Sequence, residues 1–222
     1  MADLPRCRRA TWADIDRWAD TVADGVREAD AVPETIVGLT RGGWVPGRLL
    51  CDRLGVHRLV SLRAQHWGIT ATRTGAAALT EGLSGPVRGR TVLVVDDITD
   101  TGDSLALAVD HVRARRPSRL ESAALLHITG ARHVPTYYGE EIARSRWTWV
   151  VFPWNYWEDL VALSARAAPE GTAPPKVRLE LKRRAGLDVP LRDLERVAAW
   201  KRATGPTRSP AAPRRRRARR AS

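Results

Sequence analysis

The sequence predicts an α/β fold with a mainly parallel central sheet flanked by helices, followed by a C-terminal extension. Strand-like and helix-like segments alternate through the first three quarters of the chain, as in strands joined by crossover helices. Thr91–Val95 is a continuous run of β-branched residues and leucine, which is typical of parallel strands buried on both faces. With 222 residues, the chain is long enough for one domain with a substantial core plus accessory structure.

The first expected element is an amphipathic helix within residues 11–30, with Thr11 as its N-cap. Its apolar side chains recur at three- and four-residue steps, with Asp and Arg between them: Trp12, Ile15, Trp18, Ala19 and Val22. The pattern then predicts, in chain order, a strand at 35–39, a helix at 44–54, a strand at 57–62, the strand 91–95, a helix at 105–116 and strands at 120–128 and 147–152.

Residues 64–89 interrupt this alternation. The stretch is rich in glycine and threonine and has little periodicity, so it predicts a long flexible loop, with or without a hairpin. Loops of this length in compact domains are usually functional lids or disordered segments.

The net charge of +12 is unevenly distributed along the chain. Residues 1–175 hold 21 basic and 21 acidic side chains, residues 176–204 hold nine and four, and residues 205–222 hold seven arginines and no acid. We predict a linker at 169–175, a basic helical extension at 176–204 and a disordered Arg-rich tail at 205–222. The arginines could neutralise nucleic-acid phosphates, but a solvated tail is favoured because no aromatic residue lies among them.

Several protein classes are excluded by simple features of the chain. The first ten residues carry three arginines and no apolar core, unlike a secretory signal, and no apolar run has the length of a membrane helix. Cys7 and Cys51 are the only cysteines, and their spacing fits neither a disulfide framework nor a zinc site. We therefore expect a cytoplasmic protein.

The segment Val94–Ser104 holds several neighbouring residues that could bind a ligand. Its second half begins a helix, so backbone N–H groups and the positive end of the helix dipole could bind an anion there. Thr101 and Ser104 add hydroxyl donors, and Gly102 lets the backbone come close to a phosphate. Asp96 and Asp97 would repel a bare phosphate, so they suit a ligand that is hydroxyl-rich or metal-bound at its other end. The alternative is that all of these are ordinary turn residues.

This string resembles the phosphoribosyl pyrophosphate signature of the type I phosphoribosyltransferases. Two further segments resemble the purine salvage branch of that family, the hypoxanthine, guanine and xanthine enzymes. Leu39–Trp44 is similar to its first loop, which holds pyrophosphate, and Trp149–Asn155 is similar to its purine-covering hood. The resemblance spans about residues 35–160 and leaves the C-terminal quarter unexplained.

The resemblance implies a phosphoribosyltransferase domain at 1–168, with its flexible loop at about 64–89 and a small hood at about 130–160. It also implies Mg²⁺, bound through pyrophosphate and the ribose hydroxyls near Asp96 and Asp97, and a homodimer or homotetramer. The implied substrates are phosphoribosyl pyrophosphate and a nucleobase.

The resemblance further implies a role for each matching residue. Asp96 and Asp97 would hold the ribose hydroxyls, and Asp100 would be the catalytic acceptor of the proton from the base N7. Asp100, Thr101, Gly102, Asp103 and Ser104 would bind the 5-phosphate. Arg41, Gly42 and Arg63 would bind pyrophosphate. The base would contact His127, Trp149, Val150 and Asn155.

His127 departs from the family pattern. The related enzymes have a lysine at the end of the corresponding strand, which donates to the 6-oxygen of the purine; a neutral histidine lacks that permanent charge. A 7-deazapurine is therefore an alternative acceptor, and a purely structural histidine is an alternative role. The aromatic cluster around residue 150 could equally be a packed core edge or a subunit interface, although strand alternation places Trp147 and Trp149 on one face.

The sequence is consistent with two candidate functions. The first is a Mg²⁺-dependent transfer of phosphoribosyl from phosphoribosyl pyrophosphate to a purine-like base. The second is a phosphoribosyl pyrophosphate-sensing regulator that binds nucleic acid through the basic C-terminus. Asp100 favours the enzyme, because a sensor needs no proton acceptor.

Overall fold

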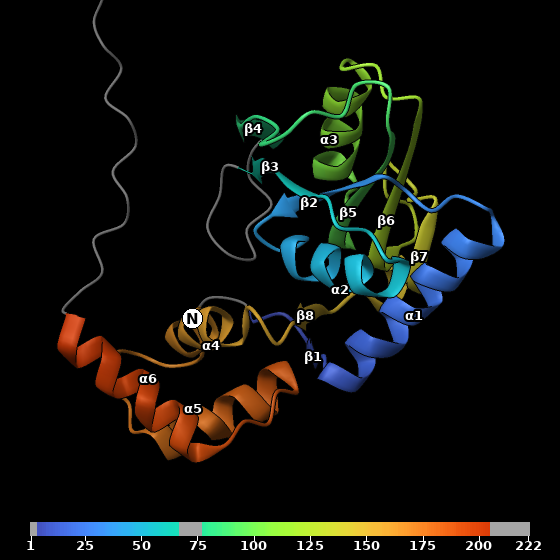
Figure 1. Ribbon diagram of the computed structural model, residues 1–222. Coiled ribbons are helices and arrows are strands. Elements are labelled where there is room, and N and C mark those ends of the chain that lie inside the picture. Colours follow the sequence, from blue (N-terminus) through green and yellow to red (C-terminus); the bar gives the residue numbers. More distant parts are fainter. Residues whose placement is uncertain (1–3, 67–76, 205–222) are drawn as a thin grey trace, which may run out of the picture.

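The computed structural model describes residues 4–66 and 77–204 and contains the predicted α/β fold (Figure 1). Its main sheet has the strand order β4-β3-β2-β5-β6-β7, with every neighbouring pair parallel except β3 and β4. The strands are β2 (Thr35–Thr40), β3 (Leu59–His66), β4 (Ala77–Glu81), β5 (Thr91–Thr99), β6 (Arg119–Ile128) and β7 (Tyr137–Ile142). The prediction of a mainly parallel sheet is confirmed.

Helices cover both faces of this sheet. Helices α1 (Trp12–Glu28) and α2 (Trp44–Leu54) lie on one face, and α3 (Asp103–Arg113) lies on the other (Figure 1). Neighbouring residues of β2 show the alternation: Ile36 packs with α1 and α2, whereas Val37 packs with α3. Because both faces are covered, β2 and β5 are almost entirely apolar until they reach the site.

Thr11 caps α1 as predicted. Its Oγ1 accepts a hydrogen bond from the Asp14 N–H at 3.1 Å, and the Asp14 carboxylate accepts from the Thr11 N–H at 3.0 Å. This reciprocal capping box satisfies two N–H groups that the helix itself leaves unpaired.

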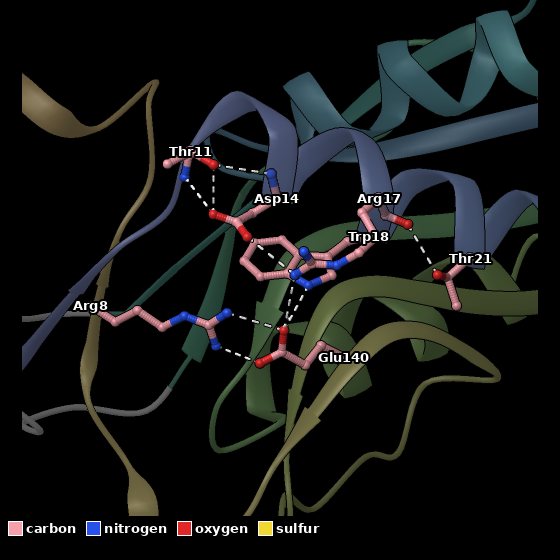
Figure 2. A network of polar contacts seen from close by, with 7 residues as sticks. All are labelled: Arg8, Thr11, Asp14, Arg17, Trp18, Thr21 and Glu140. Carbon is pink, nitrogen blue, oxygen red and sulfur yellow. Dashed lines mark hydrogen bonds and ion pairs between the residues drawn. The ribbon is translucent and has the colours of Figure 1, made fainter.

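The N-terminal strand β1 (Cys7–Arg9) pairs in parallel with β8 (Trp149–Val151), away from the main sheet. Figure 2 shows how Glu140 of β7 anchors this part: it pairs with Arg8, and its Oε2 accepts from Trp18 Nε1 at 2.8 Å. The hydrogen bond from Arg8 lowers the pKa of Glu140. The network joins β1, α1 and the edge strand β7.

The C-terminal quarter forms a separate helical group beside β1 and β8 (Figure 1). It contains α4 (Tyr156–Ala167), α5 (Pro174–Glu180), a π-helical turn (Leu181–Ala185) and α6 (Leu191–Thr204). These helices share an apolar cluster that Leu4 and Val151 complete. The predicted linker is shorter than expected, because Pro174 already begins α5, where a proline fits the first helical turn.

Two predicted segments fall partly or wholly outside the described residues. The strands β3 and β4 form an antiparallel pair within the expected loop at 64–89, and residues 67–76 between them lie outside the described part. The predicted tail at 205–222 also lies outside it. Within 4–66 and 77–204, no helix combines the length and apolar character that a bilayer crossing requires.

Candidate active site

The predicted ligands of ribose, 5-phosphate and pyrophosphate lie at the carboxyl edge of the sheet, where several parallel strands end. β5 carries Asp96 and Asp97 and leads into the turn from which α3 begins. Thr40, the last residue of β2, lies opposite Arg63 of β3, so the first loop begins beside Arg63 at this same edge. Loops and helix N-termini that can hold a ligand converge at such an edge.

Asp96 and Asp97 form a carboxylate pair in which Asp97 is buried and Asp96 is half-buried. Asp97 is only 8% exposed, and its Oδ2 accepts a hydrogen bond from Trp154 Nε1 at 3.2 Å. Asp96 Oδ1 accepts from the Asp97 N–H at 3.0 Å. Burial raises the pKa of both carboxyls, and the charge of Asp97 raises the pKa of Asp96 further. Hydroxyl donors or a cation from a ligand would offset this repulsion.

The first loop packs directly against this pair because it contains two glycines. A Cβ atom on Gly42 would lie 2.2 Å from Asp97 Oδ2, and one on Gly43 would lie 2.3 Å from the carbonyl oxygen of Val95. The peptide bond that enters the loop, between Thr40 and Arg41, is cis. Glycine therefore allows the backbone of this loop to lie against the predicted ribose-binding carboxylates.

The turn before α3 has the geometry of an anion site. Gly102 is the N-cap residue and has a left-handed backbone with φ of +83°. The carbonyl of Thr101 accepts from the Arg132 N–H at 2.7 Å, while Thr101 Oγ1 accepts from the Asp103 N–H at 3.4 Å. In α-helices generally, the first N–H groups lack a carbonyl partner within the helix, and the helix dipole favours an anion at this end. This turn also contains Ser104.

Asp100 is held by two side chains that the sequence analysis did not assign to the site. The Arg144 guanidinium pairs with Asp100 Oδ1 and donates to the backbone oxygen of Asp100. Trp147 Nε1 donates to Asp100 Oδ2 at 3.2 Å. Arg144 belongs to the 3-10 turn Arg144–Arg146, which lies between β7 and β8 in the predicted hood. The predicted proton acceptor thus has a donor on each carboxylate oxygen.

Arg41 and Arg63, the predicted pyrophosphate ligands, each pair with a glutamate. Arg41 donates to both carboxylate oxygens of Glu158 at 2.8 and 2.6 Å, and Arg63 donates to Glu81 of β4 at 2.7 Å. Both pairs are exposed, so each stabilises the protein by about 1 kcal/mol at most. An incoming polyphosphate would displace them at a correspondingly low energetic cost.

His127 lies at the end of β6 but is enclosed by protein. It is 3% exposed, its ring centroid lies 5.2 Å from that of Tyr138, and its Nδ1 has no hydrogen-bond partner within the described residues. Burial lowers the pKa of His127, which favours the neutral imidazole. The structure brings it next to Thr99 of β5, one residue before Asp100.

The other predicted base-binding residues lie around β8 and face different surroundings. Trp149 packs against the C-terminal apolar cluster, and Val150 is buried with Ile15 and Phe152 on the other side. Asn155 precedes α4, and its carbonyl accepts from the Asp159 N–H at 2.9 Å. Among the described residues, no hydrogen bond or ion pair joins these three to Asp96, Asp97 or Asp100.

Trp147 and Trp154, rather than Trp149, contact the acidic residues. The sequence analysis had placed Trp147 in the aromatic cluster without a site role, and strand alternation had grouped it with Trp149. In the structure β8 begins only at Trp149, so the two-residue period does not extend back to Trp147. The sequence carries no local signal for Arg144, because its partner lies 44 residues away.

The chain matches the family described as the phosphoribosyl transferase domain over residues 9–159. A curated relative, the xanthine-guanine phosphoribosyltransferase of Cereibacter sphaeroides, is 29% identical over 150 residues, which cover 65% of this chain and 84% of that protein. The family match includes the glycine-rich first loop and the acidic segment of the site, and it ends near the start of the C-terminal helical group.

Solved structures show the same fold. A purine phosphoribosyltransferase from Pyrococcus horikoshii is 27% identical with a TM-score of 0.57, and the match covers 67% of this chain and 93% of that chain. The Helicobacter pylori xanthine-guanine-hypoxanthine phosphoribosyltransferase is 22% identical with a TM-score of 0.56, covering 72% and 99%. At that identity, the second likeness concerns the fold alone.

Proposed function

Because this chain belongs to the phosphoribosyltransferase family, as an enzyme of its type I purine salvage branch, we propose that it transfers the 5-phosphoribosyl group of phosphoribosyl pyrophosphate to a purine or purine-like base. The acceptor is guanine, hypoxanthine, xanthine or a 7-deazapurine, and pyrophosphate is released. The observation that supports this most is the adjacent pair Asp96 and Asp97, of which Asp97 is buried, beside the turn that opens α3.

The arrangement suits a substitution at the anomeric carbon of the ribose. A ring nitrogen of the base forms a bond to this carbon while the bond to the pyrophosphate oxygen breaks, and the electron pair leaves with pyrophosphate. The proton displaced from the base passes to Asp100. Asp96 and Asp97 accept hydrogen bonds from the ribose hydroxyls, and the turn Thr101–Ser104 holds the 5-phosphate, so the sugar is fixed at both ends.

The protein residues fit Mg²⁺ that arrives with the substrate. No group of three or more potential metal ligands occurs within the described residues, so the protein by itself offers no complete cage. Burial raises the pKa values of the Asp96 and Asp97 carboxyls, and a nearby cation would stabilise their ionised forms. When bound, Mg²⁺ would neutralise charge that develops on the departing pyrophosphate.

A base panel tests the activity directly. Pure protein is incubated with phosphoribosyl pyrophosphate, Mg²⁺ and guanine, hypoxanthine, xanthine, adenine or a 7-deazapurine, and nucleotide and pyrophosphate are quantified. We expect nucleotide formation with at least one 6-oxopurine or 7-deazapurine, and no product without Mg²⁺. Absence of product across the panel would contradict the proposed function.

The Asp100→Asn variant tests the assigned proton acceptor. We expect turnover to fall by about 100-fold or more, with a much smaller change in the affinity for phosphoribosyl pyrophosphate, because the amide cannot take the proton. Asp110→Asn is the matched control, since Asp110 lies on the exposed side of α3 and pairs only with Arg113 in the described part of the chain. Equal turnover in Asp100→Asn and wild type would refute the role.

A regulator that binds nucleic acid remains the second candidate, but the described contacts do not favour it. In the C-terminal helices, Arg178 and Lys182 pair with Asp188, and Arg183 pairs with Glu180. Deleting residues 205–222 separates the candidates: a regulator would lose a salt-sensitive nucleic-acid affinity, whereas the enzyme would keep its turnover. A cytoplasmic location and a homodimer or homotetramer stay predictions.

A further inference from the structure

The hood surrounds the Asp100 carboxylate with two hydrogen-bond donors of different kinds. Trp147 Nε1 donates to Oδ2 at 3.2 Å, and the Arg144 guanidinium pairs with Oδ1 and also donates to the backbone oxygen of the same residue. Arg144 is therefore fixed at two points, and the N–H edge of its planar guanidinium lies beside the group that receives the proton in the proposed function.

The edge of the base that would face Asp100 also carries the substituent on C6. In a purine, N7 and the substituent on C6 lie next to each other on one edge of the ring system. If Asp100 takes the proton at N7, the C6 substituent must lie within reach of a group that flanks the Asp100 carboxylate. Within the described residues, Arg144 is the only charged side chain that pairs with Asp100.

We propose that Arg144 is a specificity-determining residue that selects an oxygen over an amino group at C6 of the base. The proposal rests on the proposed function and names which bases that function uses. A guanidinium carries only donors and is always charged, so it binds a carbonyl oxygen well. A 6-amino group also donates, so it would leave both donors facing each other without an acceptor.

The neighbouring cations are less suited to this role. His127 is 3% exposed and packed against Tyr138, so its ring is enclosed rather than presented to a ligand. Arg132 points to Asp103 at 3.8 Å, and its side chain is 77% exposed. Arg41 is engaged with Glu158 on the pyrophosphate side of the site. Arg144 is the one among these four that joins Asp100.

The experiment compares four full-length proteins: wild type, Arg144→Gln, Arg144→Lys and the control Arg146→Ala, which changes an exposed arginine in the same 3-10 turn. Each is assayed with phosphoribosyl pyrophosphate, Mg²⁺ and either hypoxanthine or adenine. Adenine is followed both as a substrate and as an inhibitor of hypoxanthine turnover. The KM for phosphoribosyl pyrophosphate and the thermal unfolding midpoint are measured for every protein.

We expect Arg144→Gln to lower kcat/KM for hypoxanthine by at least about tenfold, because a hydrogen bond to a charged group is lost. Adenine should bind as well as in wild type or better, since an amide can also accept from an amino group. Arg144→Lys should keep most of the preference for hypoxanthine, and the KM for phosphoribosyl pyrophosphate should change by less than about twofold in every variant. Arg146→Ala should match wild type.

Three results would overturn the assignment, and they are distinct. An equal loss for hypoxanthine and adenine in Arg144→Gln, with the unfolding midpoint unchanged, would make Arg144 only a positioning residue for Asp100. An unchanged preference in Arg144→Gln would remove Arg144 from base selection while leaving the proposed function intact. Inactive wild type with every base would instead refute the proposed function itself, and the selection role with it.

Discussion

Gly42 is a residue at which a single methyl group should matter. A Cβ atom there would lie 2.2 Å from Asp97 Oδ2, so either the first loop or the carboxylate would have to move. We expect Gly42→Ala to weaken the binding of phosphoribosyl pyrophosphate by at least about tenfold, as a shift of this size disturbs a preorganised site. Titration calorimetry with phosphoribosyl pyrophosphate and Mg²⁺ measures the effect.

The matched control is Gly82→Ala, because a Cβ on Gly82 has no atom within 4 Å in the described structure. Its affinity should equal that of wild type. If Gly42→Ala also bound like wild type, the close approach of the loop to Asp97 would have no part in binding.

At the residue scale, the sequence predicted that the proposed ribose and phosphate ligands lie together, but it did not predict the contacts that Asp100 makes with Arg144 and Trp147. Asp96 to Ser104 form one continuous string, so local order alone brings them together at the end of β5. Arg144 and Trp147 reach Asp100 only because β7 and β8 bring the hood back over the sheet, and no spacing rule encodes that return. The side-chain roles of His127 and Trp149 stay predictions.

At the scale of elements, α4 meets the first loop through the pair between Glu158 and Arg41. The pair is bidentate, but the side chains are 51% and 70% exposed, so solvent and salt screen it strongly. We expect Glu158→Gln to lower the KM for phosphoribosyl pyrophosphate by no more than about fivefold, because a competitor for Arg41 is removed. Steady-state kinetics at low and high salt measure it.

The dependence of the KM on salt concentration checks the expected effect of Glu158→Gln. The difference between Glu158→Gln and wild type should shrink as the salt concentration rises. A higher KM in the variant would instead mean that Glu158 orients Arg41 for the substrate.

Elements with strong local patterns were predictable, and elements that depend on distant partners were not. The helix 44–54 has the predicted bounds, and α1 has its predicted cap. β7 was missed because Tyr137–Ile142 contains a glycine and two glutamates, which disfavour a strand locally. In the fold, Arg8 and Trp18 satisfy Glu140, and α1 lies so close that a Cβ on Gly139 would be 2.5 Å from Trp18.

At the scale of the whole molecule, a buried carboxyl lies where the C-terminal helices meet the rest of the protein. Asp159 of α4 is 3% exposed, and its Oδ2, like the nearby Trp149 Nε1, has no hydrogen-bond partner within the described residues. Burial raises the pKa of Asp159 to about 7; the nearby Trp149 indole offsets part of this shift, and the charges of Glu158 and Asp97 add to it. The ionised form therefore destabilises the fold.

The sign of the pH dependence follows from this shift. The unfolded chain loses the Asp159 proton near its ordinary pKa of 3.8, whereas the folded chain keeps it to about 7. Stability should thus fall as the pH rises between these values and level off above about 7. Asp159→Asn removes this contribution, so it should stabilise the protein more at about pH 8 than at about pH 5, with a change of up to about 3 kcal/mol between them.

Denaturant unfolding of wild type and Asp159→Asn at the two pH values measures the difference. Asp52→Asn is the control, because Asp52 is an exposed residue of α2. A stability gain for Asp159→Asn that does not depend on pH would show that Asp159 is not protonated in the folded protein near neutral pH.

The pairing of β1 with β8 has a consequence for how the chain acquires its fold during synthesis. Residues 7–9 leave the ribosome early, yet their strand partner at 149–151 is made some 140 residues later. Loop closure over such a separation is slow, and the N-terminal segment waits unpaired while the main sheet forms. The turn with Arg144 lies between β7 and β8, so we expect the proposed base side of the site to be completed together with this late pairing, after the proposed sugar side on β5 and α3 has formed.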